Sequence, residues 1–182
     1  LKNYLKYWEF NLVIVKNRNT KHGDFRMLSE GVHQISVNNS ANPYRFLITI
    51  IHEIAHLVAF KDFGYFIKPH GKEWKSCYQK LITPFLKPEI FPQKLLDLLV
   101  HHFKNPKAST DSDFNLVIEL NKFDPETEKN YIFELDLGTI FEIHNSRKFV
   151  LGSMRKKRYE CKEILTQRKY LFSPHAQVKK VK

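Results

Sequence analysis

The chain has 182 residues and a formal net charge of +11, and 42% of its residues are hydrophobic. This size allows one moderate domain, or one domain with a small appendage, and the apolar content excludes a largely disordered chain. Two widely spaced cysteines, Cys77 and Cys161, argue against a disulfide framework and favour a cytoplasmic protein, and no apolar run is long enough to predict a membrane span.

The first third of the chain predicts two strands followed by a helix. Residues Phe10–Asn17 form an apolar run and His33–Asn38 alternate apolar and polar side chains, so both segments are expected to be strands. Between them, Asn19–Arg26 reads as a turn or loop. Asn42 is a suitable N-cap in front of a proline, which favours the first helical position, so a helix is predicted over 43–63.

Two further helices are predicted before the pattern changes. A helix is expected to follow Gly71 and end near Pro84, because four apolar side chains recur there at helical spacing: Trp74, Cys77, Tyr78 and Leu81. Residues Phe91–Phe103 predict the third helix. The segment 104–115 loses this periodicity and gathers Pro, Ser, Thr and Asp. We therefore predict a first domain over 1–105 and a linker or surface loop over 106–130.

The last part of the chain predicts a small antiparallel β unit over 131–182. Short apolar runs alternate with polar turns there: YIFELDL, TIFEIH, RKFVL, RYECKEI and KYLFS. Together with the helical first domain, this pattern predicts the α+β class.

The positive charge is concentrated at the C-terminal end. Residues 145–182 carry twelve Lys and Arg but two acidic residues, Glu160 and Glu163. This asymmetry predicts a polyanionic partner, and nucleic acid bound without sequence preference is the leading candidate. The alternative is a solvated basic surface that keeps the protein soluble. Tyr159, Tyr170 and Phe172 are candidates for base stacking. The candidate phosphate contacts are Arg147, Lys148, Arg155, Lys156, Lys157, Arg158, Arg168 and Lys169.

Two histidines and a glutamate interrupt the apolar run TIIHEIAHLVAF in the first predicted helix. His52 and His56 are four residues apart, so they project from the same face of a helix and can bind one zinc ion. Glu53, beside the first ligand, is a candidate general base for a catalytic site. A chance match is the alternative, but buried His and Glu side chains without a metal or partner would carry a desolvation cost.

A catalytic zinc site usually has three protein ligands, so a third is needed. The metzincin pattern HExxHxxGxxH is broken, because Ala59 and Asp62 occupy its glycine and last histidine positions. Asp62, Glu73 and His70 are the candidates. We favour His70, because it lies at the start of the next helix, with thirteen residues between it and His56, and precedes Gly71, which lets the backbone pass close to a metal.

The pair HEIAH (52–56) and HGKEW (70–74) resembles the SprT-like zinc metallopeptidases, as do the upstream segments GDFR and ISVNNSANPYRFL. This resemblance covers roughly the first hundred residues. It implies a zincin-like fold, one catalytic zinc held by His52, His56 and His70, and Glu53 as the base. The family often carries a C-terminal zinc ribbon with paired cysteines. Here Cys161 is the single cysteine in that region, so the β unit resembles a ribbon without metal, held by aromatic packing.

The predicted function is zinc-dependent hydrolysis of peptide bonds. The resemblance suggests proteins on DNA, or cross-linked to it, as substrates. The strand around 34–38 is expected to pair with an extended substrate. The alternative is a zinc-containing nucleic-acid-binding protein with little or no catalytic activity, although a purely structural site has no need of Glu53. Hydrolysis of a non-peptide bond stays open, since HExxH alone does not specify the substrate.

Overall fold

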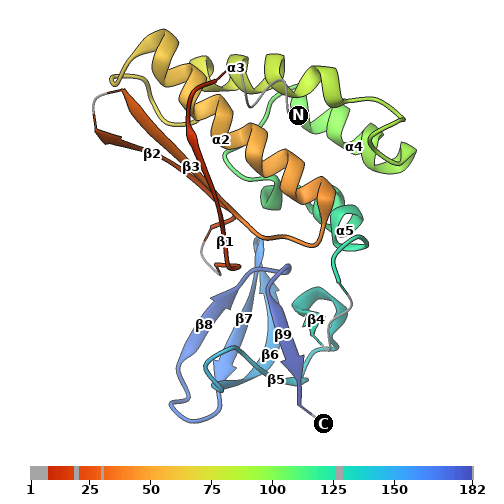
Figure 1. Cartoon of the computed structure of the whole chain (residues 1–182). Coiled ribbons are helices and arrows are strands. Elements are labelled where there is room, and N and C mark those ends of the chain that lie inside the picture. Colours follow the sequence, from red (N-terminus) through yellow and green to blue (C-terminus); the bar gives the residue numbers. More distant parts are fainter. Residues whose placement is uncertain (1–7, 19–20, 30, 126–128, 182) are drawn as a thin grey trace. The chain divides into compact units, whose positions relative to one another are not determined.

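The computed structural model describes residues 8–18, 21–29, 31–125 and 129–181. The chain divides into two compact units, Leu1–Pro125 and Glu126–Lys182. The first unit combines a sheet with helices and the second consists mainly of a sheet (Figure 1), which confirms the predicted α+β class.

The sheet of the first unit has three strands, β1 (Asn11–Val15), β2 (Gly23–Ser29) and β3 (Val32–Asn38). Their order is β1-β3-β2, with β1 parallel and β2 antiparallel to β3. Because β3 is paired on both sides, the prediction that residues 34–38 pair with a substrate is wrong. The free edges of this sheet belong to β1 and β2.

The predicted loop 19–26 differs from the structure, because β2 begins within it; residues 19–20 lie outside the described part. Gly23 and Asp24 are poor strand formers, so their local sequence gave no strand signal. Pairing decides the conformation instead, since Asp24 lies opposite Ser36 and Phe25 lies opposite Ile35 of β3.

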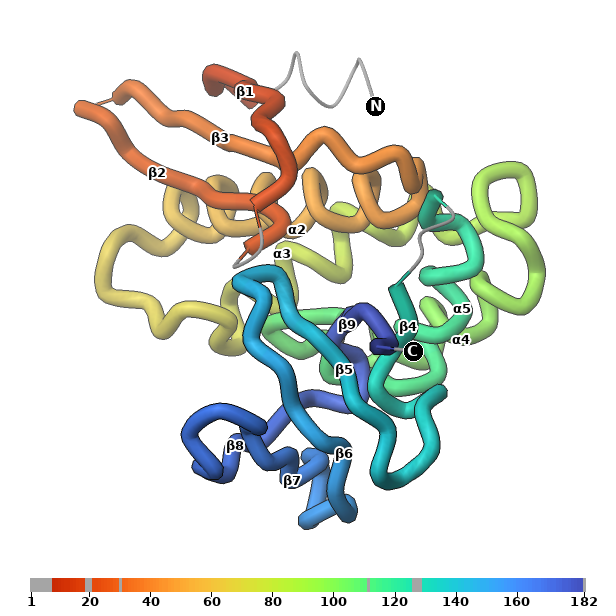
Figure 2. The backbone as a smooth tube through the Cα atoms, turned by 90° about the horizontal axis from the view of Figure 1, so that it is seen from below, coloured from red at the N-terminus to blue at the C-terminus, as the bar shows by residue number. Residues whose placement is uncertain are grey.

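The three predicted helices are confirmed as α2 (Pro43–Phe63), α3 (Lys72–Ile82) and α4 (Gln93–Phe103). The side-chain oxygen of Asn42 accepts hydrogen bonds from the backbone N–H groups of Tyr44 and Arg45, as expected of an N-cap. A short 3-10 turn, Thr83–Phe85, follows α3. Figures 1 and 2 both show α2 between the sheet and α3, and it contacts β2, β3 and α3.

A fourth helix, α5 (Phe114–Asn121), lies where the sequence predicted a linker. It follows a 3-10 turn, Thr110–Ser112, and Asp113 caps it by accepting from the N–H of Leu116. Leu116 and Leu120 are fully buried in the core of the first unit. The structure therefore places residues 106–125 in the first unit, and residues 126–128 of the predicted linker lie outside the described part.

The second unit is a six-stranded antiparallel sheet in the order β4-β9-β5-β6-β7-β8. A 3-10 turn, Ile132–Glu134, follows the first strand. Sequence reasoning predicted strands in five runs. The first run, 131–137, is wrong beyond Tyr131, because a 3-10 turn follows, and the last strand was missed. The strands are β4 (Asn130–Tyr131), β5 (Ile140–Glu142), β6 (Lys148–Arg155), β7 (Arg158–Glu163), β8 (Lys169–Phe172) and β9 (Gln177–Lys180).

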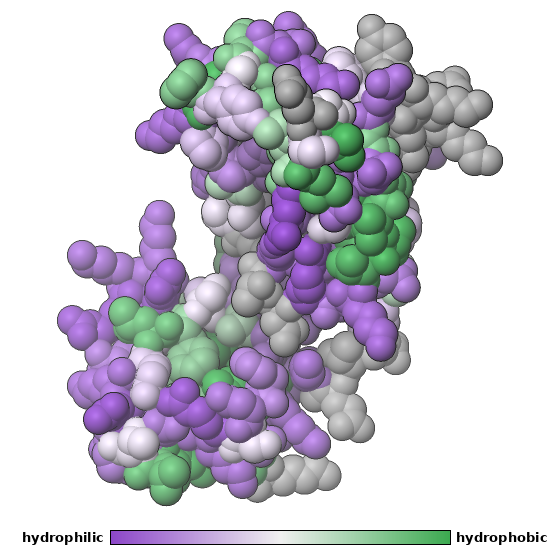
Figure 3. Space-filling view, turned by 60° about the vertical axis from the view of Figure 1, so that its left-hand side comes forward, coloured by the Kyte–Doolittle hydropathy of each residue, from purple (hydrophilic) through white to green (hydrophobic). Residues whose placement is uncertain are grey.

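Aromatic packing holds this second sheet, as expected. Phe141 and Phe149 are fully buried, and Phe172 packs against both rings at centroid distances of 5.3 and 4.9 Å. Cys161 is buried in the same core. The surface of this unit in Figure 3 is largely hydrophilic, with small apolar areas between long polar side chains. Within the described residues, no helix is long and apolar enough to cross a membrane.

Candidate metal centre and cleft

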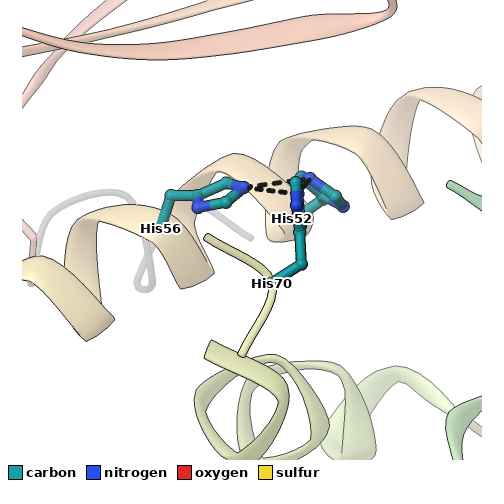
Figure 4. Close-up of side chains that lie close together, drawn as sticks. All are labelled: His52, His56 and His70. Atoms are coloured by element: carbon teal, nitrogen blue, oxygen red, sulfur yellow. Dashed lines mark hydrogen bonds between the residues drawn. The ribbon is translucent and has the colours of Figure 1, made fainter. Parts of the chain in front are cut away.

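Three imidazole rings converge on one point in the first unit (Figure 4). His52 and His56 project from consecutive turns of α2, and His70 approaches from the segment that precedes α3. The three Nε2 atoms lie 3.2 Å (52–56), 3.0 Å (56–70) and 3.3 Å (52–70) apart. The predicted ligands are therefore brought together, and they form a group that could hold a metal ion.

The nitrogen triangle has the size that a tetrahedral zinc site requires. Zn–N bonds of about 2.0–2.1 Å place the ligand nitrogens about 3.3 Å apart at tetrahedral angles. Three neutral imidazoles cannot satisfy one another in this arrangement, because each Nε2 either donates or accepts and a ring of three always leaves one pair mismatched. The donor set therefore fits a zinc ion that takes all three lone pairs.

The backbone conformation just before α3 positions the third histidine. His70 has a φ of 57°, in the left-handed region that non-glycine residues seldom adopt. The following residue, Gly71, has no room for a side chain, since a Cβ there would lie 2.8 Å from the carbonyl oxygen of Lys68. Gly71 is thus needed for this tight turn, whereas the sequence had suggested that it makes space for the metal.

Trp74 fixes the orientation of all three rings. Its ring centroid lies 4.7 Å from that of His52, 5.3 Å from His56 and 4.6 Å from His70, and its side chain is fully buried. Tyr78 contacts His52 in an edge-to-face arrangement and donates a hydrogen bond to the carbonyl oxygen of Ile48. Aromatic packing thus holds the ligands in place before any metal binds.

Burial keeps these histidines uncharged. Burial, together with the smaller effect of the neighbouring histidines, lowers the pKa of His52 to about 3 and that of His56 to about 4. The pKa of His70 is lowered by burial as well. Neutral imidazole is the form that coordinates a metal, so the site has its ligands ready at neutral pH.

Glu53 is buried beside the metal centre, with 6% of its surface exposed. Its carboxyl packs directly against Gly23 of β2, where a Cβ would lie 2.5 Å from Oε1, and it accepts a hydrogen bond from the backbone N–H of Phe25. Burial, and to a smaller extent the charge of Asp24, raise the pKa of Glu53 to about 8, although Arg18, Lys21 and the N–H of Phe25 oppose the rise. A bound divalent cation would oppose that rise by favouring the carboxylate.

The other candidates for a metal ligand are not part of this group. Among the residues that the structure describes, the three histidines form the one cluster of His, Cys, Asp and Glu able to hold a metal. Asp62 and Glu73 lie outside it, so the geometry favours His70 among the candidates for the third ligand. His144 and His175 form no such cluster with Cys161.

The metal centre opens into a cleft of about 480 Å³ within the first unit. Its lining includes residues 21–25 at the start of β2, Ile48 and Thr49 of α2, and Tyr78. It also includes Arg18 and the segment 107–110, which sequence reasoning did not connect with the site. Nothing in their local sequence could have done so, because β2 pairing and the folding of α5 onto the core bring them there.

The eight candidate phosphate contacts are arranged unevenly in the second unit. Residues Arg155–Arg158 form the exposed tip of the β6–β7 hairpin. Arg147, in contrast, pairs with Glu163 at 2.5 Å and lies over the rings of Phe149 and Tyr170.

The remaining candidates differ in their ion pairs. Glu160 pairs with both Arg155 and Lys169, at 2.8 Å each. Lys148 and Arg168 are exposed. The proposed stacking residues Tyr159, Tyr170 and Phe172 are partly buried against the second core.

Fold and site together define an α+β domain with a group of three histidines that could hold a metal ion, and with a buried carboxyl group in the same cleft. The SprT-like family model matches residues 12–90, so this part of the chain is similar to the SprT-like family. The match spans β1 to α3 and contains all three histidines and Glu53. It excludes α4, α5, the segment 107–110 and the second unit. No solved structure matches the chain.

Proposed function

We propose that this protein is a zinc-dependent metallopeptidase in which His52, His56 and His70 hold the zinc and Glu53 is the general base. The observation that carries the proposal is the buried carboxyl of Glu53, which lines the same cleft as the three histidines. A purely structural metal site gains nothing from a carboxyl group that is costly to bury. The SprT-like match over residues 12–90 supports the same class of activity.

The chemistry divides between the metal and the chain. When bound, zinc supplies a Lewis acid that polarises a carbonyl group and makes water more acidic. Glu53 takes the proton of the attacking water at its carboxylate and returns it to the leaving amine. The N–H of Phe25 and the contact with Gly23 hold this carboxylate against β2, so the proton acceptor has a fixed position in the cleft.

The free edge of β2 is the proposed place for the substrate backbone. Residues 23–25 of β2 line the cleft, and β2 is an edge strand of the sheet. An extended peptide can add to such an edge through main-chain hydrogen bonds, which is the interaction that a peptidase needs to hold its substrate near the base.

A second candidate function is nucleic-acid binding by the second unit. It is favoured by four consecutive exposed cations, Arg155–Arg158, at the tip of the β6–β7 hairpin. Such a surface would bind phosphates without sequence preference, with an affinity that falls as salt rises. Combined with the peptidase, it would direct hydrolysis to proteins associated with DNA. Without catalysis, the chain would be a zinc-containing nucleic-acid-binding protein.

The decisive experiment compares two glutamate variants after loading with zinc. Glu53→Gln should retain about one zinc per chain and lose peptide hydrolysis. The control Glu73→Gln should retain both, because Glu73 lies in the same region but outside the metal-binding group. His70→Ala should weaken zinc binding. Hydrolysis by Glu53→Gln at the wild-type rate, or absence of zinc from the wild type, would contradict the peptidase proposal.

A further inference from the structure

Positive side chains line the cleft on segments far apart in the sequence. Arg18 and Lys21 lie before β2, and Lys107 lies in the segment that connects α4 with α5. Apart from Glu53, the described acidic residue in the lining is Asp24. The charge of Asp24 is already compensated, because it pairs with Lys21 at 2.8 Å and also with Arg26.

Arg18 is held at the cleft by neutral groups. Its Nε donates to Oδ1 of Asn38 at 2.8 Å, and its Nη1 donates to Oγ of Ser36 at 3.0 Å. The amide of Asn38 donates in turn to the carbonyl oxygens of Arg18 and Lys21. This network fixes the guanidinium without an ion pair, so its charge acts on the cleft, where it also lowers the pKa of Glu53.

The segment around Lys107 has defined anchors at both ends. Nε2 of Gln79 on α3 donates to the carbonyl of Phe103 at 2.8 Å. At the other end, His102 lies 3.5 Å from the carboxylate of Asp113, the N-cap of α5. Lys107 itself is exposed, and within the described ranges no acidic side chain pairs with it.

We propose that this cleft selects peptides with an acidic side chain next to the scissile bond, and that Lys107 and Arg18 are the residues that determine this specificity. The inference rests on the proposed peptidase function and adds a substrate class to it. A glutamate beside the scissile bond gains attraction from both cations, whereas a lysine there meets repulsion. For partly exposed charges this difference corresponds to roughly a three- to tenfold preference. Lys107 lies outside the family match, whereas Arg18 lies within it.

The test uses three peptides that differ at one position beside the cleaved bond, which carries Glu, Gln or Lys. The zinc-loaded wild type should cleave the Glu peptide with the highest kcat/KM. In Lys107→Glu, the ratio of kcat/KM for the Glu peptide to kcat/KM for the Lys peptide should fall about tenfold. The control Lys87→Glu makes the same change in net charge at an exposed position that does not line the cleft. Its ratio of kcat/KM values should equal that of the wild type.

Two results would overturn the inference. One is an unchanged ratio of kcat/KM for the Glu and Lys peptides in Lys107→Glu. The other is an equal change of this ratio in Lys87→Glu, which would show general attraction to a basic protein. Binding to zinc-loaded Glu53→Gln, measured by fluorescence anisotropy, separates this inference from the peptidase proposal. If the wild type cleaves none of the peptides, the proposed function fails. The selectivity inference still stands if the Glu peptide binds most tightly and Lys107→Glu removes that difference, and it falls if the three peptides bind equally.

Discussion

The contact between Gly23 and Glu53 gives the sharpest prediction. A methyl group at position 23 would lie 2.5 Å from Oε1, 2.7 Å from Cγ and 2.9 Å from Cδ of Glu53. Rotation of the carboxylate alone cannot relieve all three contacts, because Cγ is among them. Ordinary contact distances start near 3.4 Å, so Gly23→Ala should displace the carboxylate by about 1 Å, a shift that can reduce the rate of a positioned reaction about 100-fold.

The assay measures steady-state kcat together with zinc content. In Gly23→Ala, kcat should fall about 100-fold while about one zinc per chain remains, because the three atoms nearest to the Cβ all belong to Glu53 and none to a histidine. Gly31→Ala is the control, because a Cβ at Gly31 would meet nothing within 4 Å. Its φ of 74° should make this variant less stable by about 1 kcal/mol, and its kcat should equal that of the wild type. Wild-type kcat in Gly23→Ala would refute the assigned position of the base, and so would loss of its zinc.

Three further predictions concern the ligand support and the second unit. Trp74→Leu should weaken zinc binding 10- to 100-fold in competition with a chelator, because the ring orients all three ligands, whereas Trp8→Leu should not. Arg147, helped by the Thr166 hydroxyl, lowers the pKa of Glu163 from 4.5 to about 2. This pair stabilises the second unit fully above pH 4.5, and the stabilisation is lost as the pH falls towards 2. The protection factors of the β7 amides against hydrogen exchange should therefore fall over that range, and less so in Arg147→Ala. Phe149→Ala should lower the free energy of unfolding of that unit by about 3–5 kcal/mol in denaturant titration, and an unchanged midpoint would contradict the packing described above.

Local sequence predicted those elements whose signals are local. Asn42 and Pro43 mark the start of α2, and aromatic and β-branched runs mark β5 to β8. The segment Gly23–Ser29 becomes a strand only because β3 lies beside it, and α5 was hidden by the polar residues of its N-terminal cap. In both cases a contact distant in sequence outweighs weak local preference.

The metal centre was more predictable than the cleft around it. His52 and His56 share one helix face, so their spacing alone places them together, and His70 needs one short connection to reach them. Arg18 and Lys107 are 89 positions apart, and no periodicity links them. Gly23 acts through the absence of a side chain, which becomes informative only when its neighbour Glu53 is known.

Asn42, the N-cap of α2, also forms hydrogen bonds with residues that are distant in the sequence. The fully buried amide of Asn42 donates to the carbonyl of Leu120 at 2.8 Å and to the carboxylate of Asp124 at 2.7 Å. A shortened chain ending at residue 105 would leave this donor unsatisfied, at about 1–3 kcal/mol, and would uncover the surface that α5 buries. The helices α2 and α5 therefore stabilise each other. A graft of this domain into another protein must extend to residue 125.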